Sequence, residues 1–398
     1  MALRGNPRRP EPSSELPTAK SGESRRALVV VSDFSRLESM YPDWDRFVDS
    51  YAVSPYYLSG FLRSYFVESV TEAKRRRRFV VMMKEGGKPV GLAAFQINES
   101  YILWRPRLFE FRTAQFLLPD SWSPDFVAQP DRRIEFVERA LSLLFDRLGC
   151  RSVSLTLASD SPTVPILTDW CEKRKMALQR HPHPRHPWHA TVRVQGTWEV
   201  FLKSLGKKYI QNYRRSEHRL DEAGSWRVTC QRVDNQSVVD KVLEIDRHSW
   251  KQTLRNERGE SDDPEMARIL DFHLRTPGSE FCPLAWFLEL NGKPIAFALV
   301  MILGGIAYQP NASYNASYRY LAPGKVLDMK MFQDTFAKGQ VKRMEFFTSH
   351  DYMKAWAPQI KRRDTFVIEN HRGPFKMLLA LRRSKLVADL GQTLTERM

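Results

Sequence analysis

Residues 86–97 read GGKPVGLAAFQI, and residues 291–302 read NGKPIAFALVMI. Each stretch follows an apolar run, RRFVVMMKE ending at Glu85 or PLAWFLEL ending at Leu290. Two apolar runs joined by Gly-Gly or Asn-Gly are typical of a β-hairpin, because these residues accept the positive φ angles of a tight turn. The sequence therefore predicts the same hairpin twice.

The segments after the hairpins extend the repeat. Apolar residues recur every three or four positions from Ile134 to Leu148, which predicts an amphipathic helix ending near Gly149, followed by a strand at 150–159. After the second hairpin, Met329, Phe332 and Phe336 have the same spacing, and a strand is expected at 341–349. The expected fold class is α/β (α+β), with two tandem domains, each a twisted mixed sheet flanked by helices.

Composition sets the expected boundaries. The chain of 398 residues is long enough for two domains. Residues 1–26 have proline, serine and charge without apolar periodicity and are expected to be a disordered tail. Domains are expected at 27–180 and 198–374, joined by a linker rich in proline and histidine at 181–197 and followed by a C-terminal helix at 375–398.

Charge and cysteine usage limit the function classes. The formal net charge of +16 predicts attraction to an anion, which could be a nucleic acid, a phosphorylated cofactor or a membrane surface. The four cysteines lack metal-ligand spacing, and the histidines of 181–189 have no acidic or cysteine neighbours, so no metal is expected. No signal peptide or membrane-spanning run is evident, and a cytoplasmic location is expected.

An anion site is expected where a helix begins after a turn. Residues 322–326 read APGKV, where free N–H groups of a first helical turn and the helix dipole would attract a phosphate. The Walker A and G-x-G-x-x-G patterns do not fit. A single helix is expected over 197–224, with a basic stripe suited to an anion or RNA formed by Lys208, Arg215 and Arg219.

These segments together resemble a known family. The helix at 202–224, EIDRHSWKQTL at 244–254, the second hairpin, LAPGKVL at 321–327 and SHDYMKAW at 349–356 resemble GNAT acyltransferases of the CelD/BioF-like group, which are similar to FemAB-like aminoacyl transferases. The resemblance implies a bacterial acyltransferase that uses acyl-CoA, such as acetyl-CoA, as co-substrate. It implies a cleft opened by a β-bulge or splay, and CoA pyrophosphate bound by Ala322, Pro323, Gly324, Lys325 and Val326.

The resemblance leaves the acid/base groups open. His350 and Asp351 are the candidate bases beyond the last strand, and Tyr352, Tyr314 and Tyr318 are the candidate proton donors. The acceptor, an amine or hydroxyl of a small molecule or glycan precursor, is expected to contact Asp246, His248, Trp250 and Trp356. Two alternatives remain open: an aminoacyl-tRNA-dependent transferase, and a non-catalytic protein that binds a polysaccharide-synthesis system or, weakly through its C-terminal helix, an anionic membrane surface.

Overall fold

The structure is a computed structural model. It describes residues 26–32, 41–52, 54–66, 76–103, 108–118, 124–184, 187–252, 270, 283–346, 351–356 and 359–370. The expected C-terminal helix at 375–398 lies outside these residues, as does the expected N-terminal tail except for Arg26. That residue belongs to the first strand and forms ion pairs with Glu85 (2.8 Å) and Glu135 (2.6 Å).

The first repeat, β1 to β7, contains both hairpin strands and the helices around them. Its strands are β1 (Arg26–Val31), β2 (Arg76–Glu85), β3 (Lys88–Leu103), β4 (Leu108–Phe116), β5 (Val127–Ala128), β6 (Cys150–Ala158) and β7 (Ala177–Pro182). Its helices are α1 (Tyr41–Tyr51), the 3-10 turn η2 (Pro55–Tyr57), α2 (Ser59–Phe66), α4 (Arg133–Ser142) with the π-helical turn η4 (Leu143–Arg147), and α5 (Thr163–Arg174).

The second repeat, β8 to β14, has the same sequence of hairpin, strand, helix and strand. Its strands are β8 (Trp188–Arg193), β9 (Trp226–Arg232), β10 (Leu284–Leu290), β11 (Lys293–Leu303), β12 (Ile306–Tyr314), β13 (Arg343–Phe346) and β14 (Gln359–Glu369). Its helices are α6 (Trp198–Ser204), α7 (Lys207–Ala223), α8 (Gln236–Arg247), η5 (Ala316–Leu321), α11 (Pro323–Lys338) and η6 (Asp351–Trp356).

The two predicted hairpins are confirmed, and they match in detail. Both turn residues have positive φ in each hairpin, at 58° and 84° for Gly86 and Gly87 and at 51° and 77° for Asn291 and Gly292. These values are those of a type I′ turn, whose twist suits paired strands. Each hairpin also has a register shift at the same distance from its turn, between Met83 and Lys84 in one and between Leu288 and Glu289 in the other.

The prediction of a single helix over 197–224 is wrong, because the chain forms two helices there, α6 and α7. Leu205 and Gly206 have ψ angles of 144° and 141°, which is extended backbone, and Gly206 precedes α7 as its N-cap. A glycine inside a helix costs about 1 kcal/mol relative to alanine, so the break falls where the helix is weakest.

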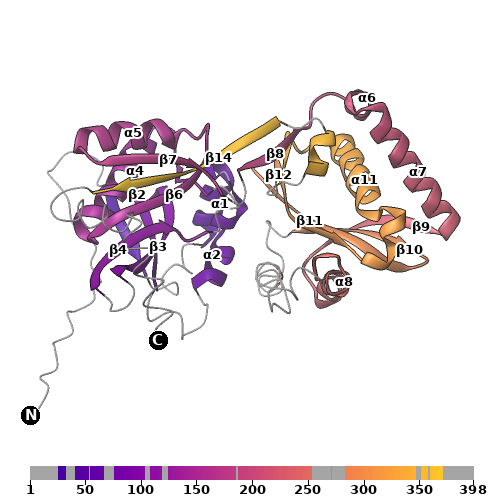
Figure 1. Cartoon of the computed structure of the whole chain (residues 1–398), viewed down its shortest axis with the longest axis horizontal. Coiled ribbons are helices and arrows are strands. Elements are labelled where there is room, and N and C mark those ends of the chain that lie inside the picture. Colours follow the sequence, from indigo (N-terminus) through magenta and orange to yellow (C-terminus); the bar gives the residue numbers. More distant parts are fainter. Residues whose placement is uncertain are drawn as a thin grey trace, which may run out of the picture.

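The last strand of the second repeat also pairs with the first repeat. The sheet order is β1-β2-β3-β4-β6-β14 on one side and β9-β10-β11-β12-β13-β8 on the other, with β14 also pairing with β8. The last strand, β14, therefore pairs with β6 and β7 of the first repeat, and β8, inside the stretch expected to be a linker, pairs with β13. Figure 1 shows β14 running from one lobe into the other.

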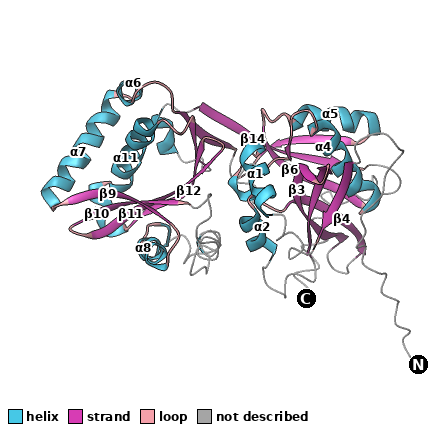
Figure 2. Cartoon of the chain, turned by 180° about the vertical axis from the view of Figure 1, so that it is seen from behind, coloured by secondary structure: helices cyan, strands magenta, loops and turns pink. Residues whose placement is uncertain are grey.

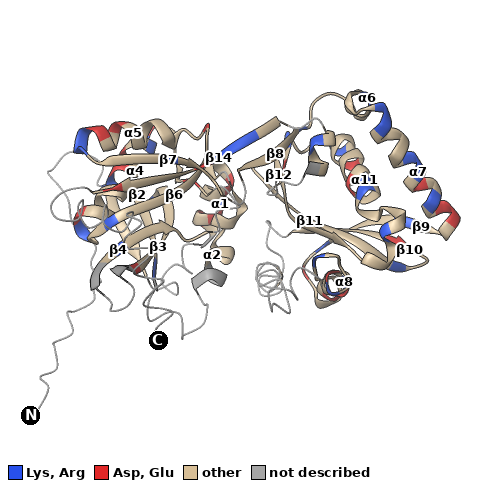
Figure 3. Cartoon of the chain, in the orientation of Figure 1, with Lys and Arg blue, Asp and Glu red and all other residues tan. Residues whose placement is uncertain are grey.

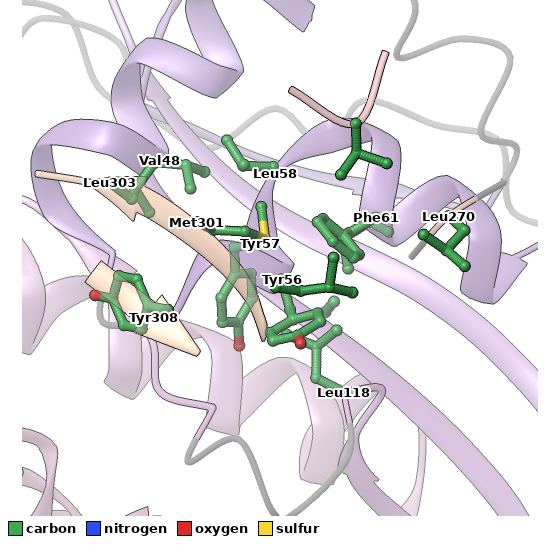
Figure 4. Packing of buried hydrophobic residues seen from close by; sticks show 14 of the residues in the cluster. Val48, Tyr56, Tyr57, Leu58, Phe61, Leu118, Leu270, Met301, Leu303 and Tyr308 are labelled. Atoms are coloured by element: carbon green, nitrogen blue, oxygen red, sulfur yellow. The ribbon is translucent and has the colours of Figure 1, made fainter. Parts of the chain in front are cut away.

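A core shared by both repeats joins the lobes. Tyr56, Tyr57 and Phe61 of the first repeat belong to one buried cluster with Met301 and Tyr308 of the second (Figure 4). The backbone N–H of Gly304, in the turn between β11 and β12, donates to Asp49 Oδ1 of α1 at 2.8 Å. The pairing of β14 with both repeats, together with this core, makes each repeat depend on the other for burial of its apolar surface.

Helices cover both faces of the second sheet. The apolar side chains of α8 pack in the shared cluster with Phe297 and Leu299 of β11, whereas those of α6, α7 and α11 pack in a separate cluster with Ala296 and Ala298 on the opposite face. Figures 1 and 2 show α8 on one side of β9 to β11 and α7 and α11 on the other. None of the helices in the described ranges is long and apolar enough to cross a membrane.

Candidate functional site

The candidate site lies beside the parallel pair of strands in the second sheet. Strands β12 and β13 pair from Ile306↔Arg343 to Gln309↔Phe346, the last residue of β13 that the structure describes, and β12 continues to Tyr314. Just at this point β12 has a bulge, because its pairing with β11 moves from Met301↔Tyr308 to Leu299↔Asn311 and leaves Gln309 and Pro310 facing one residue. A bulge leaves backbone polar groups available to a ligand.

The matching strand of the first repeat is irregular on its other side. Strand β4 pairs with β3 in unbroken register from Phe95↔Phe116 to Tyr101↔Glu110, and its register shift lies against β6, between Arg112 and Thr113. The cations at the start of α4 are also paired internally: Arg132 with Glu85 at 3.2 Å, and Arg133 with Asp125 at 3.9 Å. The features expected of a cofactor site are therefore found together at the second repeat.

The predicted anion loop forms the start of α11. Pro323 and Gly324 lie in the first turn of the helix and not in a turn before it, since α11 begins at Pro323. The positive φ belongs to Ala322, at 51°, which ends η5 and directs the chain into the helix. The N–H groups of Lys325 and Val326 donate to the Ala322 carbonyl at 3.1 and 3.4 Å. In the described chain the N–H of Gly324 donates to no carbonyl, so it is the first-turn donor that an anion could use.

The basic stripe of α7 meets this helix start. Arg215 and Arg219 line a surface hollow of about 420 Å³ together with Asn212, His218 and Lys325. Burial and the charge of Arg219 lower the pKa of Lys325. Lys208 is exposed but does not line the hollow. Cations brought close together without a counterion form a site for an anion such as a phosphate. Figure 3 shows the basic segments along α7 and α11.

A cluster of aromatic side chains and one buried carboxyl lies beside the bulge of β12. Trp356 is 1% exposed and donates from Nε1 to the Tyr209 hydroxyl at 2.7 Å. The Lys325 ammonium lies 5.4 Å from the centre of the Tyr209 ring. Asp328 of α11 is 8% exposed, and its Oδ1 accepts a hydrogen bond from Gln309 Nε2 at 3.3 Å. Burial raises the pKa of Asp328 to about 7, and the Gln309 bond only partly opposes that rise.

The proton-donor candidates lie on three different elements. Tyr352 of η6 is 54% exposed, and its ring meets the Trp356 ring edge-on at 5.7 Å. Desolvation raises the pKa of Tyr352, and the negative charge of Asp328 raises it further. Tyr314 ends β12 beside Gly324, and Tyr318 of η5 is half-buried against the same core.

The remaining predicted residues lie at the end of α8 or in the undescribed segments. Asp246 is the last residue but one of α8, and His248, the C-cap of that helix, has Nδ1 2.9 Å from the Glu244 carbonyl. The His248 carbonyl accepts from the Ala316 N–H of η5 at 2.9 Å, so the segment that carries Trp250 lies beside the end of β12. His350 and the side chain of Asp351 lie outside the described part of the chain.

Asp328 and Tyr209 were missed in the sequence. Asp328 lies four residues before Phe332, on the buried stripe of α11, and an acidic residue within an apolar stripe is the signal that could have revealed it. Tyr209 has the spacing of an apolar position in its helix, four residues before Tyr213. Its hydroxyl contact with Trp356 joins residues 147 positions apart, and no sequence spacing encodes that contact.

Comparison with known proteins gives the class. Residues 207–355 match the family model described as "Acetyltransferase (GNAT) domain". The crystal structure of FemX is similar over 82% of this chain and 95% of that chain, with 10% identity and a TM-score of 0.53. A search of curated proteins finds no match. Residues 207–355 therefore resemble a GNAT acetyltransferase domain, and the fold of the chain is similar to that of FemX.

Two further solved structures are similar at lower TM-scores. One is a tandem GNAT protein from the clavulanic acid biosynthesis pathway, with 11% identity, a TM-score of 0.44 and coverage of 86% of this chain and 98% of that chain. The other is L-PGS from Bacillus licheniformis, with 10% identity, a TM-score of 0.49 and coverage of 87% and 96%.

Proposed function

We propose that the second repeat transfers an acyl group from acyl-CoA to an amine or hydroxyl acceptor. The observation that carries the proposal is the convergence of Lys325 at the start of α11 with Arg215 and Arg219 of α7 around one hollow, next to the bulge of β12. A CoA pyrophosphate is the kind of anion that a helix N-terminus with nearby cations attracts. The bulged strand β12 beside it would bind the pantetheine arm.

The chain's own groups can supply what acyl transfer requires. The reaction needs an acceptor held near the thioester, a group to take its proton and a donor to protonate the leaving thiolate. Tyr352 is the proposed donor, because its side chain is half-exposed and its ring contacts Trp356, the hydrogen-bond partner of Tyr209. Backbone N–H groups of β12 next to Pro310 are the proposed stabilisers of the developing oxyanion.

The acceptor site is proposed beside the segment that follows α8. Lys251 donates from Nζ to Asn311 Oδ1 at 2.7 Å and to the Ala312 carbonyl at 2.8 Å, which ties the segment after α8 to β12 just beyond the bulge. Asp246, His248 and Trp250 belong to this segment or adjoin it. An amine or sugar acceptor entering there would approach the thioester from the face opposite α11.

Binding of acetyl-CoA tests the donor site. Arg219→Ala and Lys325→Ala should each weaken binding about fivefold to tenfold at low salt, since an exposed ion pair contributes roughly 1 kcal/mol. Arg214→Ala is the matched control, because Arg214 is an exposed arginine of the same helix that does not line the hollow. Equal weakening in all three variants, or no binding of acyl-CoA by the parent protein, would refute the proposal.

A second candidate is aminoacyl transfer from a charged tRNA, which the exposed cations of α7 favour. Contacts with phosphates release counterions, so the logarithm of the tRNA affinity should fall linearly with the logarithm of the salt concentration. A competition experiment decides between the two acyl donors. Tighter binding of aminoacyl-tRNA than of acetyl-CoA would favour this candidate, if the tRNA affinity also falls steeply with salt and Lys208→Ala makes that fall less steep.

A further inference from the structure

The two sheets meet at a short pairing between β8 and β14. Strand β14 pairs with β6 over Arg363 to Glu369, but with β8 only over Gln359 to Arg362. On its other side β8 pairs with β13, which pairs in turn with β12 of the candidate site. Figure 1 shows β14 passing from one lobe to the other beside β8. A short pairing of two strands is marginal by itself in water, so side-chain contacts are needed to hold it.

A cluster of charged side chains joins the three strands at this junction, and Glu345 of β13 is its centre. His189 Nε2 of β8 lies 3.1 Å from Glu345 Oε2, and the Thr191 hydroxyl donates to the same oxygen at 2.8 Å. Beside Oε1 lie Arg343 Nε at 2.9 Å and Lys361 Nζ of β14 at 3.7 Å. His189, Thr191 and Glu345 are all buried. One buried carboxylate therefore holds groups from β8, β13 and β14 together.

Strand β14 brings two cations close to His189. Burial is the main cause that lowers the pKa of His189, and the contact with Glu345 opposes it. The positive charges of Arg363 and Lys361 lower that pKa further. Arg363 is fully buried, so water screens its charge little. His189 is therefore the neutral member of the cluster at pH 7.

The other two elements beside β8 and β13 add no anion. On β12, Tyr308 pairs with Glu345 and is buried in the shared core, where burial raises the pKa of its phenol. On η6, the Lys354 ammonium lies 5.4 Å from the centre of the Trp188 ring, next to His189 in the chain. Among the described residues, Glu345 is the carboxylate that pairs with His189.

The second ring nitrogen of His189 is buried without a partner. No hydrogen-bonding group of the described chain reaches Nδ1. Because Nε2 lies beside a carboxylate, the neutral ring carries its proton on Nε2 and none on Nδ1. Protonation would place a buried N–H at Nδ1 without an acceptor, and it would add a cation to Arg343, Lys361 and Arg363. Both effects are costly away from water, so the closed junction favours neutral His189.

We propose that His189 and Glu345 form a pH-sensitive contact that keeps β14 paired with β8 while His189 is neutral and releases β14 when His189 is protonated in mildly acidic solution. Burial opposes ionisation of Glu345, but the surrounding cations lower its pKa to about 2, so Glu345 stays ionised over this range. The release affects the candidate site, because β13 lies between β8 and the bulged strand β12. This device goes beyond the proposed acyl transfer and does not depend on it.

The direction of the response follows from the lowered pKa. A histidine that binds its proton weakly in the closed junction binds it more tightly in the open one, where water reaches the ring. The open form therefore gains population as the pH falls below the ordinary value of 6.5. Between pH 7.5 and pH 5.5 the ratio of open to closed junction should rise about tenfold, and it should return when the pH is restored.

Amide hydrogen exchange of the full chain measures this opening at pH 7.5 and pH 5.5, after correction for the intrinsic pH dependence of exchange. The amides of 359–362 should lose about tenfold in protection at pH 5.5, whereas those of β2 and β3 should change less than about twofold. Equal protection of 359–362 at both pH values overturns the proposal. An equal loss in β2 and β3 also overturns it, because the opening would then be global.

His189→Gln removes the titrating ring and keeps an N–H that can donate to Glu345. The pH response at 359–362 should disappear in this variant, and a response that persists overturns the role of His189. His181→Gln is the matched control, because His181 is an exposed histidine of β7, the strand that pairs with the other part of β14. The control should keep the tenfold response of the parent, and its loss there would overturn the assignment to His189.

Thr191→Val tests the part of Glu345 without changing a titrating group. Valine has nearly the shape of threonine, so the fold should be retained, but the hydroxyl that donates to Glu345 Oε2 is lost. Protection of 359–362 should fall about tenfold at pH 7.5, since a hydrogen bond to a charged group is removed, and the response to pH should remain. Unchanged protection at pH 7.5 would show that Glu345 does not hold the junction and would overturn the proposal.

Discussion

Replacing Asp328 with asparagine should make the protein more stable at neutral pH. In the folded chain the pKa of Asp328 is raised from 3.8 to about 7 by burial. The folded state therefore holds this proton in a pH range where the unfolded chain has already released it. Between pH about 4 and 7, each pH unit then costs the folded state about 1.4 kcal/mol, and the difference of roughly three units amounts to about 4 kcal/mol at pH 8.

The sign follows from the direction of the shift. A raised carboxyl pKa favours the folded state only while the group is protonated, so the penalty is absent below the unfolded pKa and complete above the folded pKa. Asp328→Asn should match the parent in stability near pH 4 and exceed it by up to about 4 kcal/mol at pH 8. Asparagine keeps the acceptor for Gln309, so the hydrogen bond makes little contribution to the difference.

Urea unfolding at several pH values measures this difference. Every other titrating group is common to the parent and the variant, so subtracting the two unfolding free energies isolates the contribution of Asp328. Asp334→Asn serves as the control and should give a small difference with little pH dependence. A gain that is the same at pH 4 and pH 8, or a loss of stability at pH 8, would show that Asp328 is not buried without a counterion as described.

Three other variants test the fold. Gly91→Ala should destabilise the chain by more than about 2 kcal/mol in thermal or urea unfolding, because the added Cβ would lie 2.4 Å from Cγ of the Phe136 ring, whereas Gly324→Ala, where the nearest atom is 3.4 Å away, should be tolerated. Glu345→Gln should lower the free energy of unfolding at pH 7 but change it little near pH 2. Burial opposes ionisation of Glu345, yet His189, Lys361 and Arg343 outweigh it and lower the pKa of Glu345 to about 2. The stabilisation by ionised Glu345 is therefore present at neutral pH and lost as pH falls. A fragment ending at residue 186 should not fold when expressed alone, since it lacks β14, the partner of β6 and β7, and the second-repeat side of the shared core. A native-like circular dichroism spectrum of the isolated fragment would contradict this dependence.

Local features of the fold could be predicted from the sequence because their causes lie within a few residues. The two type I′ turns depend on Gly86, Gly87, Asn291 and Gly292, which accept positive φ without needing any distant contact. The helix at 323–338 likewise follows from its apolar spacing and from a proline suited to the first helical position. The match of the two hairpins was sufficient to predict a tandem architecture.

The pairing of β14 with both β6 and β8 was decided by the tertiary structure alone. Any strand with the right alternation can pair with any open sheet edge, so the sequence of β14 does not specify that β6 and β8 are its neighbours. The same limit applies to the site. The sequence indicated the loop at 322–326 and the cations of α7 separately, but only the packing of α7 against α11 brings Lys325 and Arg219 to one hollow.

The burial of Asp328 also comes from packing. In the sequence it is one of the two acidic residues of α11, and its place on the apolar stripe is what distinguishes it from Asp334. Burial against β12 removes water from one carboxyl and leaves the other paired with Lys338 at 2.8 Å near the surface. The sequence by itself determined the repeated hairpins and the helix that follows each; the tertiary structure decided which carboxyl loses its solvent, because desolvation depends on neighbours that are distant along the chain.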